Sequence, residues 1–329
     1  MPSDHPAVAA IRRAVSTDMQ LLDAVASSLI LVACSGGPDS LALAAATADV
    51  APGLGFRAGL ITVDHDLQPG SATRAQDVAS WGERRGLSPS EVVTVQVAGV
   101  GGVEAAARRA RYGALDAAAR RHRAVAVLLG HTEDDQAETV LLGLARGSGA
   151  MSLAGMARQR GLYRRPLLSI SRVDTHSAAA EQDLSVWQDP HNADSRYARS
   201  RLRALLPELE RGIGPGVVAG LARSARLLRA DAEYLDALAA DRRAAWSAPD
   251  GTMDVAALAT AATAIRGRVL RGWLIDRGVS PGALTLEHVD RIDRLLTDWR
   301  GQGPVFLPGG LAAGRRAGRL YCVGEAMPG

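Results

Sequence analysis

Apolar runs and helical patterns alternate along the first half of the chain. The apolar runs, of which the last is weaker, cover residues 29–34, 59–63, 92–97, 124–130 and 163–168. The stretches between them predict helices over 41–50, 73–85, 103–123 and 132–145. Strands that are apolar along their whole length, separated by helices, are typical of a parallel sheet that is covered on both faces. The pattern therefore predicts an α/β fold, in which ligands bind at the carboxyl ends of the strands.

The second half of the chain has a different pattern. An arginine-rich segment over 192–209 is followed by Gly212-Ile213-Gly214-Pro215-Gly216, which predicts a break. A long amphipathic helix is expected over 217–246, then a smaller, mainly helical domain with a last strand over 315–323. The predicted boundaries are 1–211, 212–246 as linker and long helix, and 247–329.

The composition excludes several classes of chemistry. The chain has no lysine, so all 38 basic residues are arginine, and a Walker A loop and Schiff-base catalysis are excluded. Its two cysteines, Cys34 and Cys322, have no metal-binding spacing. No apolar run reaches the length of a membrane span, and the first thirty residues have no signal-peptide pattern, so we expect a cytoplasmic protein. The net charge of +3 is compatible with RNA binding but does not demonstrate it.

The turn Ser35-Gly36-Gly37-Pro38-Asp39-Ser40 lies between the first predicted strand and the first predicted helix. Its glycines allow close approach of the backbone to a ligand, and the N–H groups at a helix N-terminus favour an anion. Ser35 and Ser40 add hydroxyl donors, and the carboxylate of Asp39 is a ligand that suits Mg²⁺. The alternative is an ordinary glycine-rich turn.

Ionisable side chains are crowded after the fourth predicted strand, in the segment from His131 to Thr139. On a helix that starts near Glu133, Asp134 and Glu138 share a face, and Asp135 and Glu138 lie within one turn. Acidic residues in a first turn are often only complements of the helix dipole. At the binding edge of a sheet, these carboxylates could instead coordinate Mg²⁺ or hold an ammonium group.

Two further segments are rich in arginine. Glu104, Arg108 and Arg111 form one helical stripe beside Tyr112, for which a solvated salt bridge is the alternative. The segment 189–203 carries Asn192, Arg199 and Arg201, and suits phosphates or an RNA base, although a plain basic helix would look similar. Asp64 and His65 follow the second strand and either line an adenine pocket or cap a turn.

Together these segments resemble the tRNA(Ile)-lysidine synthetases of the PP-loop ATP pyrophosphatase superfamily. The resemblance covers about residues 25–210 and rests on the Ser35–Ser40 turn, on 103–112, 131–149 and 189–192, and on Arg165-Pro166-Leu167-Leu168. Later in the chain it is weaker, and Leu307-Pro308-Gly309-Gly310 is its best point.

The resemblance implies that the enzyme joins free lysine to the wobble cytidine of a tRNA(Ile) with a CAU anticodon. ATP and Mg²⁺ are the implied cofactors, and the cytidine is adenylated before lysine displaces AMP. The implied catalytic residues are Asp39, Asp135, Glu138 and Arg201, with Asp39 also the metal ligand. The implied ATP-binding residues are Ser35, Gly36, Gly37, Pro38, Asp39, Ser40, His65 and His131. The implied lysine- or tRNA-binding residues are Glu104, Arg108, Arg111, Tyr112, Asp134, Asn192 and Arg199.

Other functions remain open at this stage. A PP-loop tRNA thiolase activates a base in the same way but depends on cysteines, and a non-catalytic adenine-nucleotide-binding regulator would need no acidic cluster. For the region after Gly216 we expect contact with tRNA, because it carries many arginines and no second acidic or glycine-rich cluster. The alternative is a stabilising domain or a homodimer interface.

Overall fold

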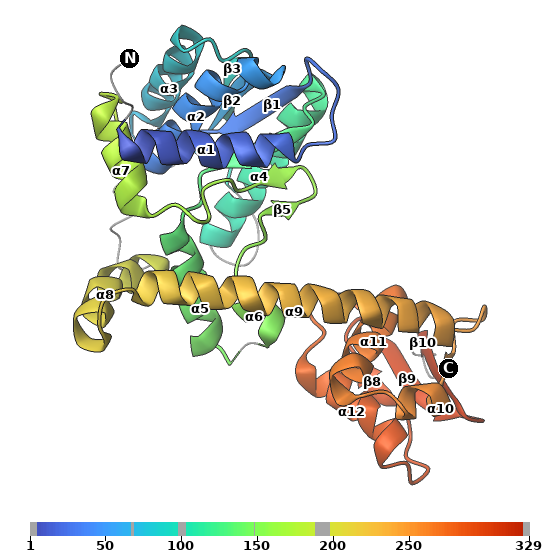
Figure 1. Ribbon diagram of the computed structural model, residues 1–329. Helices are drawn as coiled ribbons and strands as arrows, with labels where there is room; N and C mark the ends of the chain where they lie inside the picture. Colours follow the sequence, from blue (N-terminus) through green and yellow to red (C-terminus); the bar gives the residue numbers. More distant parts are fainter. Residues whose placement is uncertain (1–4, 67–68, 98–102, 148, 188–197, 325–329) are drawn as a thin grey trace. The chain divides into compact units, whose positions relative to one another are not determined.

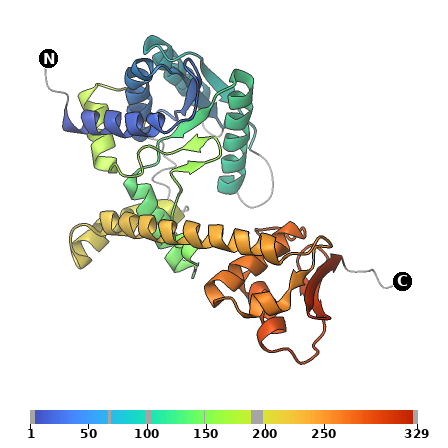
Figure 2. The same ribbon diagram turned by 45° about the vertical axis from the view of Figure 1, so that its right-hand side comes forward.

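The computed structural model describes residues 5–66, 69–97, 103–147, 149–187 and 198–324, without the side chains of residues 103 and 104. Asn192 lies outside this part. Contacts between Cα atoms divide the chain into two compact units, Met1–Arg229 and Ala230–Gly329, which are described separately. Figures 1 and 2 show the elements of each unit.

The first unit contains a sheet of six strands within the described residues. Its order is β3 (Ser90–Thr94), β2 (Arg57–Asp64), β1 (Leu29–Ala33), β4 (Ala126–Leu129), β6 (Tyr163–Arg164) and β5 (Gln159–Arg160). The pairs from β3 to β6 are parallel, and β5 is antiparallel to β6. The prediction of a parallel sheet is confirmed. The run 163–168 supplies only two strand residues, because the chain leaves the sheet at Arg165.

Helices cover both faces of this sheet. Side chains of β1 alternate between two cores: Ile30 and Val32 face one, and Leu29 and Leu31 face the other. The first core includes residues of α1 (Pro6–Gln20), α2 (Pro38–Val50), α3 (Ser71–Arg84) and α7 (Arg172–Glu181). The second is covered by α4 (Val103–His122). The short helix η1 (Pro52–Leu54) follows α2.

Helix α1 was not among the predicted elements. Its apolar residues Val8, Ile11, Val15 and Met19 are buried and recur at helical spacing. That periodicity is visible in the sequence, so the signal for the helix was present.

The remaining helices of the first unit are α5 (Glu133–Ala145), α6 (Ala150–Leu153), α8 (Ala198–Ile213) and the first part of α9 (Val217–Trp246). Helix α9 has the bounds that the sequence predicts. Gly214 and Gly216, between α8 and α9, have positive φ angles, which explains the glycines at this turn. The two units divide within α9, and the predicted boundaries at 211 and 246 stay predictions.

The second unit packs α10 (Val255–Ala259), α11 (Thr263–Asp276) and α12 (Leu286–Thr297) with an antiparallel sheet. The order of its strands within the described residues is β7 (Met253–Asp254), β10 (Arg319–Gly324), β9 (Leu311–Arg316) and β8 (Val305–Leu307). The predicted single strand over 315–323 is wrong. Ala317 and Gly318 have positive φ angles and turn the chain, so that β9 and β10 form a hairpin.

Among the helices of the described residues, none combines the length and the apolar character that a membrane crossing needs.

Candidate active site

The turn between β1 and α2 is held by its own hydroxyl groups. The Ser40 hydroxyl donates to the Gly37 carbonyl (3.0 Å) and accepts from the backbone N–H of Ser35 (3.1 Å). Gly36 has a φ of +81°, and a Cβ there would lie 2.9 Å from Val78, so a glycine is required. Pro38 starts α2 with its fixed φ, and Asp39 follows in the first turn. The backbone N–H groups at this helix start form an anion site.

Gly130, the residue after β4, packs directly against the start of α2. A Cβ at Gly130 would lie 3.1 Å from Ser40 Cα and 3.2 Å from the carbonyl group of Asp39. The backbone after β4 and the first turn of α2 therefore meet without an intervening side chain. This close approach sets the position of Asp39 relative to the end of β4.

A cavity of about 810 Å³ opens at the same edge of the sheet. This volume is within the range of small-molecule sites, which is roughly 300–1,000 Å³. Eight of the predicted site residues line it: Ser35, Gly37, Pro38, Asp39, Ser40, His65, Arg111 and His131. The sheet therefore brings together residues that are up to about a hundred positions apart.

Asp39 is held by α7 and is partly withdrawn from water. The Thr175 hydroxyl donates to Asp39 Oδ1, and His176 Nε2 lies 3.9 Å from the same oxygen. Burial raises the pKa of Asp39, and the hydrogen bond from Thr175 opposes that rise. A cation bound at this carboxylate would lower its pKa again. The described residues contain no cluster of three or more His, Cys, Asp or Glu side chains that would hold a metal by itself.

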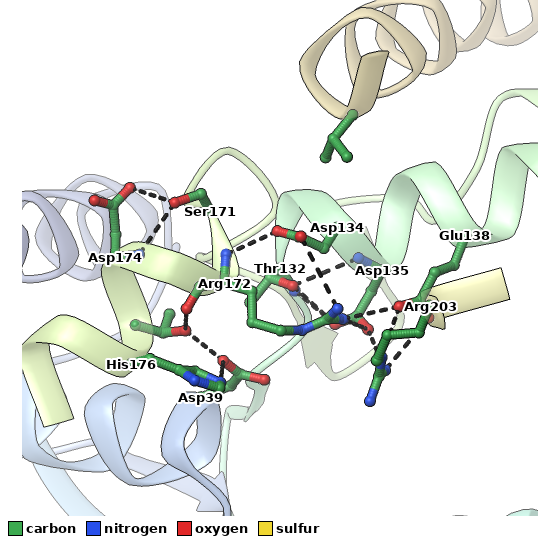
Figure 3. A network of polar contacts seen from close by, with 12 residues as sticks. Asp39, Thr132, Asp134, Asp135, Glu138, Ser171, Arg172, Asp174, His176 and Arg203 are labelled. Carbon is green, nitrogen blue, oxygen red and sulfur yellow. Dashed lines mark hydrogen bonds and ion pairs between the residues drawn. The ribbon is translucent and has the colours of Figure 1, made fainter. Parts of the chain in front are cut away.

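The acidic cluster at the start of α5 consists of Asp134, Asp135 and Glu138, and it is bound by two arginines (Figure 3). Arg172 Nη2 donates to Asp135 Oδ1 and to Glu138 Oε1, each at 3.0 Å. Arg203 Nε donates to Glu138 Oε1 at 3.0 Å. Glu138 is only 1% exposed, and a buried carboxylate needs such partners.

The helix dipole accounts for only part of this cluster. Asp135 and Thr132 form a capping box, in which Asp135 Oδ2 accepts from the Thr132 N–H at 2.8 Å. Burial raises the pKa of Asp135, but Arg172, the Thr132 N–H and Arg203 together outweigh it, and the pKa is lowered. Asp135 thus combines a capping role with an ion pair, and it carries its charge at neutral pH.

His131 lies between the strand end and this cluster. Its Nδ1 atom is buried and has no hydrogen-bond partner among the described residues. Burial, together with the nearby Arg111 and Arg165, outweighs Asp135 and lowers the pKa of His131 to about 3. A neutral imidazole that lines the cavity suits contact with an uncharged ring or a hydroxyl group.

Arg108, Arg111 and Tyr112 form a second edge of the site on α4. Both guanidinium groups lie against the Tyr112 ring, at 5.0 and 5.6 Å from its centroid. Tyr112 in turn meets the edge of Tyr163 at a centroid distance of 4.8 Å. Burial lowers the pKa of Arg111, which still remains a cation at neutral pH. The position of Arg111 in the cavity wall suits a phosphate or a carboxylate.

The sequence left two roles open for Asp64 and His65 after the second strand: lining an adenine pocket or capping a turn. Asp64 Oδ1 accepts from the Asp66 N–H at 3.0 Å and so caps a turn, whereas His65 lines the cavity.

Several residues at the site were not predicted. Arg172, Thr175 and His176 come from α7, where no motif marks them. Trp187 donates its backbone N–H to the Gly36 carbonyl at 2.9 Å, and Arg74 stacks on its ring at 4.0 Å. Both line the cavity. In the arginine-rich segment, the residue that contacts Glu138 is Arg203. Arg201, which the resemblance implied as catalytic, is exposed on α8.

Comparison with known proteins identifies the family. The PP-loop domain model matches residues 12–209, and the model of the TilS substrate binding domain matches residues 253–321. The tRNA(Ile)-lysidine synthase of Salinispora arenicola is 54% identical over 98% of both chains. The chain belongs to the tRNA(Ile)-lysidine synthase family. The synthase of Thermobifida fusca is 53% identical over 97% of this chain and 98% of its own.

The fold of this lysidine synthase family member extends to more distant proteins. The U34-tRNA thiolase NcsA from Methanococcus maripaludis has a TM-score of 0.56 and 19% identity over 68% of this chain and 80% of its own. At that identity the likeness shows the fold alone. In the lysidine synthase chain, Cys34 lies in the first unit and Cys322 in the second.

Proposed function

We propose that this chain catalyses the ATP-dependent ligation of lysine to C2 of the wobble cytidine of a tRNA(Ile) with a CAU anticodon. The observation that carries the proposal is the presence of a PP-loop and a buried acidic cluster at one edge of one sheet, beside a cavity of about 810 Å³. Family membership supports the same reaction. The thiolase and regulator alternatives have no comparable support.

In the first step, the cytosine O2 attacks the α-phosphorus of ATP. The bond between the α-phosphorus and the bridging oxygen breaks, and pyrophosphate leaves. We expect the backbone N–H groups of Gly36 and Gly37 to hold the phosphates, while the Ser40 hydroxyl, which donates to the Gly37 carbonyl, keeps the turn in shape. Arg111, in the cavity wall, supplies the cation that a lysine supplies in other phosphate sites.

Mg²⁺ fits the residues present. Mg²⁺ is usually held by one or two carboxylates together with substrate phosphates and waters, so the single carboxylate of Asp39 is enough. Asp39 Oδ1 is engaged by Thr175, which leaves Oδ2 as the oxygen for a cation. When bound, the ion would neutralise charge that develops on the phosphates.

In the second step, the ε-amine of lysine attacks C2, the bond from C2 to the adenylated oxygen breaks, and AMP leaves. Asp135 and Glu138 are the carboxylates for the incoming ammonium group. Neither residue lines the cavity itself, but Arg203, which contacts both, does, and the lowered pKa of Asp135 favours binding of a cation there. The proton lost by the amine passes to a carboxylate or to water.

We further propose that the region after Gly216 binds tRNA. The match to the substrate binding domain supports this assignment. Most of the arginines that motivate it bind within their own unit: Arg266 bonds to Asp293, Arg268 to Asp236, and Arg319 to Thr252. Arg316 is exposed and is the better candidate for a phosphate contact.

The test uses the purified full-length chain with ATP, Mg²⁺, labelled lysine and a tRNA(Ile) transcript with a CAU anticodon. We expect label in the tRNA and one pyrophosphate and one AMP per lysine incorporated. A transcript whose wobble base is uridine is the control and should accept no lysine. Pyrophosphate release with no lysine in the tRNA would refute the ligase function, and release without tRNA would indicate a different nucleotidyl acceptor.

A further inference from the structure

The start of α7 makes hydrogen bonds both to Asp39 of the PP-loop turn and to the acidic cluster on α5. Thr175 donates its hydroxyl to Asp39 on α2. The backbone N–H of Arg172 donates to Asp134 Oδ2 on α5 at 2.7 Å, and the Glu133 N–H donates back to the Ile170 carbonyl at 2.9 Å. Figure 3 shows contacts from residues of α7 both to the Asp39 carboxylate and to the acidic cluster. The backbone of Arg172 is therefore fixed before its side chain makes any contact.

The Arg172 side chain joins the two carboxylates of the cluster that are proposed to bind the amine. One nitrogen, Nη2, lies 3.0 Å from Asp135 Oδ1 and 3.0 Å from Glu138 Oε1. The Arg172 side chain is 15% exposed, so these bonds are little screened by water. A single donor between two acceptors sets both the distance between the carboxylates and their orientation.

The contacts leave one oxygen of Glu138 weakly held. Arg172 and Arg203 both donate to Oε1, whereas Oε2 receives only the longer bond of 3.4 Å from Arg203 Nη2 among the hydrogen bonds described. The Arg203 side chain is 36% exposed and lines the cavity. The three carboxylates of the cluster and the two guanidinium groups leave one negative charge in excess. The cluster thus has one weakly bonded carboxylate oxygen and the charge for one more cation.

We infer that Arg172 is a positioning residue for lysine: it fixes Asp135 and Glu138 as a pair, with Glu138 Oε2 directed to the ε-ammonium group. This inference rests on the proposed function. It assigns to α7 a role in amine binding that is separate from the contact of Thr175 with the nucleotide side of the site.

Loss of Arg172 has two opposing electrostatic consequences. Removal of a positive charge by itself strengthens the attraction for an ammonium ion. However, Glu138 is 1% exposed and would keep only Arg203 of its two arginine partners, so its carboxylate would no longer be held beside Asp135. Because the pair of carboxylates is then no longer held in one geometry, we expect the second effect to dominate and lysine binding to weaken.

The experiment measures the steady-state KM of lysine and of ATP for the full-length Arg172→Gln and Arg172→Lys variants. For Arg172→Gln we expect the lysine KM to rise at least tenfold, while the ATP KM and lysine-independent pyrophosphate release change less than threefold. Arg172→Lys restores the charge but not the planar fork, and should give an intermediate lysine KM.

The control is Arg85→Gln. Asp49 is shared by Arg85 and Arg12, as Glu138 is shared by Arg172 and Arg203, but this group lies at the surface. Its removal should leave both KM values unchanged.

An unchanged or lower lysine KM in a folded Arg172→Gln variant overturns the inference, as does an equal rise of the ATP KM. If Arg172→Gln does not fold, Arg172→Lys decides alone: a lysine KM within twofold of the wild type overturns the inference. Failure of the wild type to incorporate lysine would instead refute the proposed function.

Discussion

Replacement of Gly130 by alanine tests whether the close contact beneath the PP-loop controls ATP chemistry. The added Cβ would lie 3.1 Å from Ser40 Cα and 3.2 Å from the carbonyl carbon and oxygen of Asp39. Ordinary contacts of a Cβ lie at 3.4–4 Å. All three neighbouring atoms belong to the backbone, so no flexible side chain can turn aside. The start of α2 must therefore shift by several tenths of an ångström.

The magnitude follows from the strain of such a contact. Overpacking by one methyl group costs about 1–3 kcal/mol. If the turn relieves this strain by leaving its catalytic position, the competent fraction falls about 5- to 150-fold, since about 1.4 kcal/mol is a factor of ten. We expect kcat/KM for ATP in pyrophosphate release to fall by that factor. The lysine KM should change less than twofold, because Asp135 and Glu138 lie on another helix.

The assay follows pyrophosphate release against ATP concentration, with thermal unfolding measured in parallel. Gly220→Ala is the matched control: its Cβ would meet only Arg223 at 3.9 Å, and α9 should gain up to about 1 kcal/mol of stability. A Gly130→Ala variant that is folded and keeps kcat/KM for ATP within twofold of the wild type would refute the reasoning.

Three further predictions concern single charges in the site. Asp39→Asn should lower pyrophosphate release at least ~10²-fold. It should not lower the unfolding temperature, because burial already raises the pKa of Asp39 and opposes its charge. Pyrophosphate release near the wild-type rate would show that Asp39 does not position the metal. Glu138→Gln should raise the lysine KM more than the ATP KM, since it replaces a carboxylate oxygen at the amine site; the reverse order in substrate titrations would move Glu138 to the nucleotide site. His131 has a folded pKa of about 3 against 6.5 for the free side chain, so the unfolded chain gains a proton first as the pH falls, and stability is lost below about pH 6.5. The stability difference between the wild type and His131→Gln should therefore change by up to about 2 kcal/mol in favour of the variant between pH 7.5 and pH 5 in denaturant titrations, and a constant difference would contradict the buried neutral imidazole.

The sequence by itself determined the local features of this protein. Residues 29–33 are apolar on both faces, and the strand β1 they form is buried on both sides. The Ser35–Ser40 turn needs glycine at Gly36 for a positive φ, and this requirement is local. The spacing of Thr132 and Asp135 is that of a capping box, and α9 has the predicted bounds. Such features are readable because they depend on neighbours within one or two turns.

Only the tertiary structure decided how the acidic cluster is used. Arg172 lies 34 positions after Glu138, on a helix without a recognisable motif, and it reaches the cluster because α7 packs against α2 on the sheet face that carries the PP-loop. Likewise, the weak run 163–168 leaves the sheet after two residues, and a turn at Ala317 divides the predicted last strand. Ion pairs and strand ends of this kind depend on which surfaces meet, and a sequence pattern specifies the surface of each element without specifying its partner.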